Sequence, residues 1–338
     1  MTTIRTQPVT GECVWTGKDM EQRSAEWLIV LDAAALDDLE RALRRVQQAG
    51  IPTYQIRRED FPLPSFAPIV ARIQNEVENG RGLVMVRGFP VERYSPQEAE
   101  IIYWGLGTHI GTGVSQNARG ELISHVTDRG LEFGAKQVRG YETQSNLFFH
   151  NDHGDMVGLL CLATARSGGT SKLVSSAALY NAVLAQHPEY LEELCRGYHY
   201  HMRGEHQPGT SEVTEHRVPV FSHHEGRLST RLARNAILLG EAHLGHVLNE
   251  RERAPLDFLD ETMDALCMTM DFQPGDMQFI SNYSVLHART EFVDFDEPER
   301  KRHLLRLWLN LPVSRPLTDE FATRYGPGSA RLGVPPVR

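Results

Sequence analysis

Cysteine is scarce in this chain. Its 338 residues include only four cysteines, Cys13, Cys161, Cys195 and Cys267, and no two of them form a Cys-x-x-Cys pair. Such wide spacing argues against a disulfide framework and against a zinc-thiolate site. It favours a reducing, cytoplasmic setting.

Long apolar runs and an excess of basic charge are also missing. No run approaches the roughly 18 apolar residues that a membrane span needs, and the first residues lack the apolar core of a signal peptide. The net charge is −9, and acidic and basic residues are interspersed. Neither a membrane nor a nucleic acid is therefore expected as a partner.

The hydrophobic content, 41% of residues, is ample for a full core. Residues 1–24 are polar with little periodicity, which predicts a mobile or loosely docked arm. Residues 25–338 contain no repeat and no linker, so one domain is expected there. The sequence leaves open whether this domain forms a homo-oligomer.

Local patterns predict both helices and strands. Helical spacing runs from Asp32 to Gln48, and Ser95 with Glu98 forms a capping box at the start of another helix. Buried strands are expected at 82–90 and 156–162, and a last clear strand at 302–311. Strands in both halves, with helices before and between them, predict an α+β domain built on a β-sandwich.

A histidine and a carboxylate stand two residues apart where an apolar run ends. The run Asn146-Leu147-Phe148-Phe149 leads into His150-Asn151-Asp152. In a strand, residues i and i+2 point to the same face, so His150 and Asp152 can aim at one point. One more histidine would complete a two-His, one-carboxylate set, which suits Fe(II) with open positions. A second pair, His153 and Asp155, follows at once, and a polar strand end with no metal is the alternative reading.

Two later segments bear on that alternative. His287 stands between Leu286 and Ala288, where a strand of a barrel would end. In the strand at 302–311 one face is all leucine, while the other carries Arg302, Arg306 and a tryptophan. Charge beside an aromatic ring suits a ligand cavity, and an arginine there would bind a carboxylate. An arginine paired with Asp or Glu at the sheet surface is the alternative.

The ordered set is His-x-Asp, then the turn Gly168-Gly169-Thr170 with a hydroxyl strand, then a distant histidine, then an arginine on the following strand. This set resembles the iron(II)/2-oxoglutarate-dependent dioxygenases of the taurine dioxygenase (TauD/TfdA-like) family. The resemblance covers residues 80–312 or so and implies a double-stranded β-helix (jelly roll) core with flanking helices.

The resemblance also implies roles for individual residues. His150, Asp152 and His287 match the metal ligands, and Phe149 before the first pair favours that pair over the second. Arg306 matches the arginine that binds the distal carboxylate of 2-oxoglutarate, with Ser171 assisting it. The separation of nineteen residues between His287 and Arg306 is longer than usual, so Arg302, on the same strand face, is the alternative and is expected to touch cosubstrate or substrate.

The implied activity uses Fe(II), 2-oxoglutarate and O2 to oxidise an unactivated C–H of a small molecule, with hydroxylation expected and with release of succinate and CO2. The substrate is expected to be amino-acid-like or anionic. Candidate substrate contacts are the polar residues near the predicted pocket strands: Asn146, Asp155, Gln116, Asn117 and Asn282. Two other readings stay open: a non-catalytic β-sandwich that binds a small metabolite, and a cupin-type metalloenzyme that does not use 2-oxoglutarate.

Overall fold

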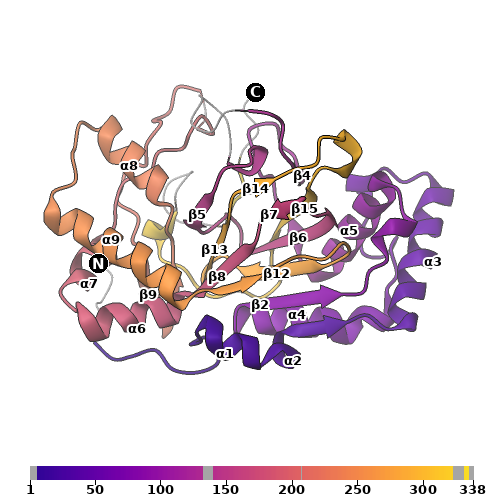
Figure 1. The fold of residues 1–338 in the computed structure, drawn as a ribbon, viewed down its shortest axis with the longest axis horizontal. Coiled ribbons are helices and arrows are strands. Elements are labelled where there is room, and N and C mark those ends of the chain that lie inside the picture. Colours follow the sequence, from indigo (N-terminus) through magenta and orange to yellow (C-terminus); the bar gives the residue numbers. More distant parts are fainter. Residues whose placement is uncertain (1–5, 132–139, 207, 323–330, 335–338) are drawn as a thin grey trace.

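The structure is a computed structural model that describes residues 6–131, 140–206, 208–322 and 331–334. Helices and strands are mixed along the chain, as the sequence predicted (Figure 1). The helices are α1 (Gly17–Gln22), α2 (Ser24–Trp27), α3 (Ala33–Ala49), α4 (Ala67–Glu78), α5 (Pro96–Ile110), α6 (Ser176–Gln186), α7 (Tyr190–Arg196), α8 (Arg234–His243) and α9 (Glu250–Leu266).

The strands alternate with these helices. They are β1 (Leu28–Val30), β2 (Leu83–Arg87), β3 (Thr112–Gly113), β4 (Ile123–Val126), β5 (Leu147–His150), β6 (Met156–Ala163), β7 (Ser167–Gly168), β8 (Ser171–Ser175), β9 (Phe221–His224), β10 (Arg227–Thr230), β11 (Met268–Met270), β12 (Met277–Ser281), β13 (Val285–Arg289), β14 (Phe292–Val293) and β15 (His303–Asn310).

Two sheets frame the site. In the described part of the chain the larger sheet follows the order β1-β2-β12-β6-β15-β3, and β4 also pairs with β15. The smaller sheet follows the order β11-β8-β13-β5. Leu83, Val157 and Trp308 of the larger sheet form a buried cluster with Leu173 and Val285 of the smaller one. The two sheets therefore pack face to face.

Strand β15 has one apolar and one polar face, as its alternating sequence predicted. Leu305, Leu307 and Leu309 belong to the main core with residues of α3, α4 and α5, which cover the outer face of the larger sheet (Figure 1). The contact with α5 is close, because a Cβ added at Gly107 would lie 2.5 Å from Leu307 Cδ2. Arg306 and Trp308 point the other way, toward the smaller sheet.

Residues 6–22 are docked, whereas the sequence predicted a mobile or loosely docked arm over residues 1–24. Val9 exchanges hydrogen bonds with the Asn181 side chain of α6, at 2.8 and 2.9 Å. Trp15 is 2% exposed, and its indole Nε1 donates to the carbonyl of Arg81 at 2.9 Å. Met20 of α1 is fully buried. Residues 6–22 thus run along the body in contact with it (Figure 1).

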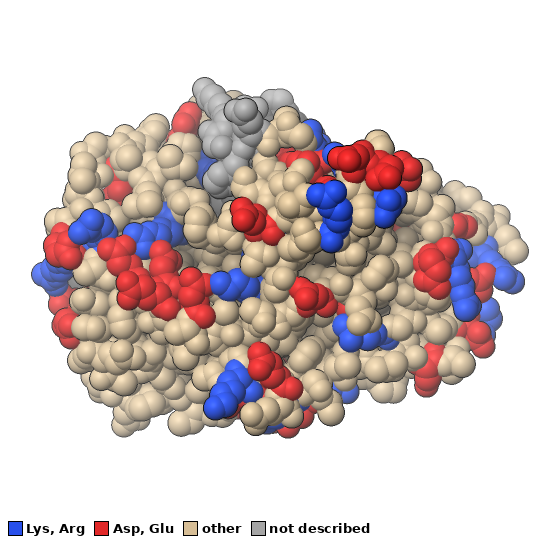
Figure 2. All heavy atoms as spheres, in the orientation of Figure 1, with Lys and Arg blue, Asp and Glu red and all other residues tan. Residues whose placement is uncertain are grey.

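The described surface carries both signs of charge. On the face shown in Figure 2, acidic and basic side chains are interspersed. Some described charges pair along a helix, such as Arg253 with Glu250 on α9. Among the described helices, none is both long and apolar enough to cross a membrane.

Candidate metal centre and active-site cavity

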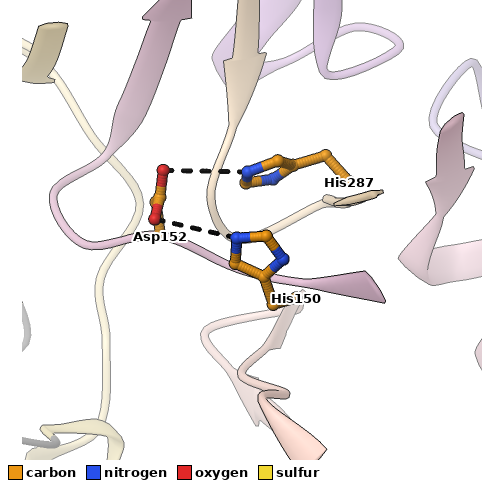
Figure 3. A group of neighbouring side chains, drawn as sticks. All are labelled: His150, Asp152 and His287. Atoms are coloured by element: carbon orange, nitrogen blue, oxygen red, sulfur yellow. Dashed lines mark ion pairs between the residues drawn. The ribbon is translucent and has the colours of Figure 1, made fainter. Parts of the chain in front are cut away.

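The two predicted histidine ligands lie on neighbouring antiparallel strands. His150 is the last residue of β5 and pairs with His287 in the middle of β13. Because paired residues point to the same face, both rings enter the space between the sheets, with centroids 4.2 Å apart (Figure 3).

Asp152 reaches the same point from a loop. The sequence predicted that His150 and Asp152 share a strand face, but β5 ends at His150 and Asp152 follows in the turn that leads to β6. Its two carboxylate oxygens face the two rings: Oδ1 lies 3.9 Å from His150 Nε2, and Oδ2 lies 3.7 Å from His287 Nε2 (Figure 3). The three residues offer ligand atoms that all lie within 4.8 Å of one another.

Hydrogen bonds set the state of these groups. His150 Nδ1 lies 2.8 Å from the Phe148 carbonyl, which can only accept, so the Nδ1 proton is fixed and Nε2 presents its lone pair to the site. Asp152 Oδ2 accepts from Trp308 Nε1 at 3.0 Å, and Arg306 Nη1 lies 3.4 Å from the same oxygen.

The surroundings keep all three groups in the form that a metal ion needs. Burial, reinforced by the neighbouring His150, lowers the pKa of His287 to about 3, and burial also lowers the pKa of His150. Burial alone would raise the pKa of Asp152, but Arg306, the two histidines and Trp308 outweigh it and bring it to about 2. Neutral imidazoles and an ionised carboxylate are ready to bind a cation without releasing protons, so the donor set fits Fe(II).

A cavity of about 180 Å³ opens beside the site, and His150 and Asp152 are part of its wall. Its wall includes the predicted residues Gln116, Asn146 and Arg306. Gln116 Oε1 accepts from Arg306 Nε at 2.7 Å and so orients that guanidinium. The wall also contains polar, basic and aromatic residues that the sequence analysis did not select: Tyr141, Tyr200, His201, Arg203, Glu205, Arg231, Arg234 and Asn235.

Three predicted substrate contacts lie outside the cavity wall and bond within the protein. Asp155 is 1% exposed and accepts from the Tyr283 hydroxyl at 3.0 Å. The Asn282 amide donates to the His153 carbonyl at 2.8 Å. The Asn117 amide donates to Glu121, and its oxygen accepts from the backbone of residue 119. These bonds fix loops around the site.

Two buried arginines that do not line this cavity lie together. Arg289, on β13, pairs with Ser171 of β8, and Arg302 immediately precedes β15. Their guanidinium carbons lie 4.7 and 5.2 Å from the centre of the same ring, Phe292. Burial lowers the pKa of each to about 10. Within the described residues, neither Nη1 atom has a hydrogen-bond partner.

A second group of potential ligands, His201, Glu212 and His243, also comes together. His201 Nδ1 accepts the backbone N–H of Arg203 at 2.8 Å, so the proton of the neutral ring is on Nε2, which faces Glu212 at 3.3 Å. A protonated Nε2 cannot bind a metal ion. His201 is therefore paired with Glu212, and its ring contacts that of His243, with centroids 5.5 Å apart.

Residues 46–308 match the family described as "Taurine catabolism dioxygenase TauD, TfdA family". The chain belongs to this family. It is 33% identical over 333 residues to FR-33289 synthase of Streptomyces rubellomurinus, which covers 96% of this chain and 97% of that protein. It is also 29% identical over 334 residues to the taurine hydroxylase-like protein SAT17 of Stachybotrys chartarum, covering 95% and 82%.

Solved structures share the fold at low sequence identity. An asparagine oxygenase in complex with Fe(II), a hydroxyasparagine and succinate has a TM-score of 0.66 and 16% identity, covering 84% of this chain and 93% of that one. The non-heme iron oxygenase OrfP, in complex with Fe and alpha-ketoglutaric acid, has a TM-score of 0.61 and 13% identity, covering 84% and 94%.

The protein is therefore a 2-oxoglutarate-dependent non-haem iron oxygenase that uses Fe(II), 2-oxoglutarate and O2. The resemblance seen in the sequence is confirmed, and the two alternatives, a non-catalytic binding module and a cupin-type enzyme without 2-oxoglutarate, are set aside.

Proposed function

We propose that this oxygenase hydroxylates an unactivated C–H of a small, anionic, amino-acid-like molecule, and that its two sheets form a double-stranded β-helix. His150, Asp152 and His287 hold Fe(II). When bound, Fe(II) supplies oxygen activation coupled to conversion of 2-oxoglutarate to succinate and CO2. The chain supplies binding, orientation and a cavity that excludes water.

The distal carboxylate of 2-oxoglutarate is assigned to Arg302, with Arg289 and Ser171 beside it. Two buried guanidiniums, each with an unpartnered Nη1 among the described residues, offer the charge and the free donors that a carboxylate accepts. Ser171 and Arg289 are directly paired on the strands β8 and β13, and they share the strand face of His287. A dicarboxylate can thus extend from the metal along that face toward the two arginines.

Arg306, which the family resemblance assigned to the distal carboxylate, has a different part in this proposal. Its Nη1 lies 3.4 Å from the ligand atom Asp152 Oδ2, so it stands at the metal rather than away from it. Tyr141 and Trp308 flank its guanidinium, with ring centres at 4.5 and 4.8 Å. From there Arg306 stabilises the ionised Asp152 and, as part of the cavity wall, would bind an anionic group of the substrate.

The cavity wall supports an anionic substrate. Four arginines line it: Arg203, Arg231, Arg234 and Arg306. Glu205 on the same wall suits an amine. The asparagine oxygenase and OrfP structures carry hydroxylated amino acids, which agrees with an amino-acid-like substrate.

The observation that carries the proposal is the convergence of three ligand atoms within 4.8 Å beside a cavity. The test is to add Fe(II) and then 2-oxoglutarate to the apoprotein under nitrogen and to record the visible charge-transfer band of the chelate. We expect the band in the wild type and no band in His287→Ala. Arg302→Met should bind Fe(II) fully but show no band at low concentrations of 2-oxoglutarate.

Candidate small molecules are then screened by succinate release, with anionic amino acids, sulfonates and phosphonates compared with their neutral analogues. Preference for the neutral analogues would contradict the substrate class. A wild type that binds no Fe(II) would contradict the metal assignment itself.

A further inference from the structure

Asp155, three residues beyond Asp152, is held by a segment from the far end of the chain. Its buried carboxylate accepts from the Tyr283 hydroxyl at 3.0 Å and from the backbone N–H of Leu311 at 2.8 Å. Arg331 completes the set: its Nε donates to Oδ1 at 2.8 Å and its Nη2 donates to Oδ2. A carboxylate this deeply buried depends on such a bidentate partner to be held in place.

The segment 331–334 is itself attached at several points. The Arg331 carbonyl accepts from the Asn310 side chain at 3.0 Å, and Val334 N–H donates to the Ser115 carbonyl at 2.8 Å. Val334 is 1% exposed, in the same cluster as Trp308. Gly333 packs closely against the backbone of Ser115, because a Cβ at Gly333 would lie 2.3 Å from the Ser115 carbonyl oxygen.

The loop that carries Asp152 is anchored at its two ends. At the first end, the Asn151 side chain bonds to the backbone of Leu232 and Val285, at 2.9 Å each. In between, Arg231 donates to the carbonyl of Asp152. At the second end, Asp155 is the anchor. Between these ends the Asn282 amide also donates to the His153 carbonyl at 2.8 Å, and Arg331 contacts Asp155, three residues from Asp152.

We propose that residues 331–334 act as a clasp that holds the metal-ligand loop in place, with Arg331 as a positioning residue for Asp152. This inference rests on the proposed function, in which Asp152 binds Fe(II). Residues that orient metal ligands from behind set the affinity of the site for its metal. Loss of the clasp leaves all three ligands present and loosens the geometry in which they meet the ion.

The chain offers a matched control for this test. Arg87 makes the same bidentate pair with another fully buried carboxylate, Asp276, at 2.8 and 2.7 Å. Arg87 and Arg331 have similar side-chain exposure, 34% and 40%. Neither Arg87 nor Asp276 lines the active-site cavity. Arg87→Gln thus reproduces the loss of a buried ion pair without touching the loop.

The experiment titrates Fe(II) under nitrogen into full-length wild type, Arg331→Gln, Arg331→Lys and Arg87→Gln, in the presence of 2-oxoglutarate, and follows the charge-transfer band. Thermal unfolding of each metal-free protein is measured alongside. We expect Arg331→Gln to bind Fe(II) about 10- to 100-fold more weakly. Arg331→Lys should recover part of the Fe(II) affinity. Arg87→Gln should lose thermal stability but keep the Fe(II) affinity of the wild type.

Fe(II) affinity in Arg331→Gln equal to that in Arg87→Gln would overturn the clasp while leaving the metal site in place. Absence of Fe(II) binding in the wild type would instead overturn the proposed function. If Arg331→Gln does not fold, Gly333→Ala provides the second test, because it lifts the segment from Ser115 and keeps the guanidinium. Unchanged Fe(II) affinity in Gly333→Ala would equally overturn the clasp.

Discussion

His150 and His287 face each other across β5 and β13, with ring centroids 4.2 Å apart. The ladder between these strands therefore places two ligands before any metal is present. Asp152, in contrast, lies in a loop, and its position is set by contacts with Trp308 and Arg306. The histidines are set by backbone pairing and the carboxylate by side chains, so substitutions around the site should affect the carboxylate first.

Arg302→Met and Arg306→Met should separate the two arginine roles. Removing a charged partner of a buried carboxylate costs about 2–5 kcal/mol, so Arg302→Met should weaken 2-oxoglutarate binding by roughly 30-fold or more with Fe(II) affinity kept. Arg306→Met should instead change Fe(II) affinity, because Arg306 contacts Asp152. Titrations of both components under nitrogen decide this, and the reverse pattern would restore Arg306 as the partner of the distal carboxylate.

Trp308→Phe should weaken Fe(II) binding by about 10- to 100-fold, because it removes the hydrogen bond from Nε1 to Asp152 Oδ2 and keeps an aromatic ring in place. Trp104→Phe is the control: Trp104 is also buried, but its Nε1 donates to the Ile56 carbonyl in the helical layer. Fe(II) affinities that fall equally in the two variants would show that the effect is not specific to the hydrogen bond.

The free energy of unfolding should decrease as pH falls from 6.5 to 4, in part through His303. Burial, together with the nearby His125, lowers the pKa of His303 to about 4 against the opposing charge of Glu100. Since the unfolded chain binds a proton near pH 6.5 and the folded one does not, acid favours unfolding over that range. Urea denaturation at several pH values should show a shallower slope for His303→Gln, and an unchanged slope would contradict this assignment.

Trp15→Ala should destabilise the protein by about 3–5 kcal/mol, because the indole is 2% exposed in the cluster between the sheets and donates to the Arg81 carbonyl. Val30→Ala, which truncates a 66% exposed side chain, should change stability by about 0.5 kcal/mol or less. Urea denaturation measures the free energy of unfolding of both variants. Equal losses of stability would contradict the prediction that Trp15 stabilises the fold.

Local patterns predicted much of the fold. The helix expected from Asp32 to Gln48 is α3, Ala33–Ala49, and the capping box at Ser95 begins α5. Helix caps and apolar periodicity involve residues within one or two helical turns of each other, so they can be recognised in the sequence alone. Trp15 shows the limit: a few apolar residues in a polar stretch show no period, and only the assembled fold shows that this one is buried.

The sequence predicted which residues form the candidate site better than it predicted which residues they contact. The sequence pointed to His150, Asp152 and His287, which the structure brings together. It could not show that Asp155 is taken by Arg331, because that pair joins distant parts of the chain. Arg289 was missed, although it has the same strand parity as His287, which was the available signal.

The two faces of β15 carry a further consequence. Its pairings with β6 and β4 would be satisfied by the backbone in any register. A shift by one residue, however, would drive Arg306 into the helical layer and turn Leu305 and Leu307 toward the cavity. Only a strand that buries its leucines in the core presents Arg306 to the metal ligands, so correct core packing is required for the active site to form.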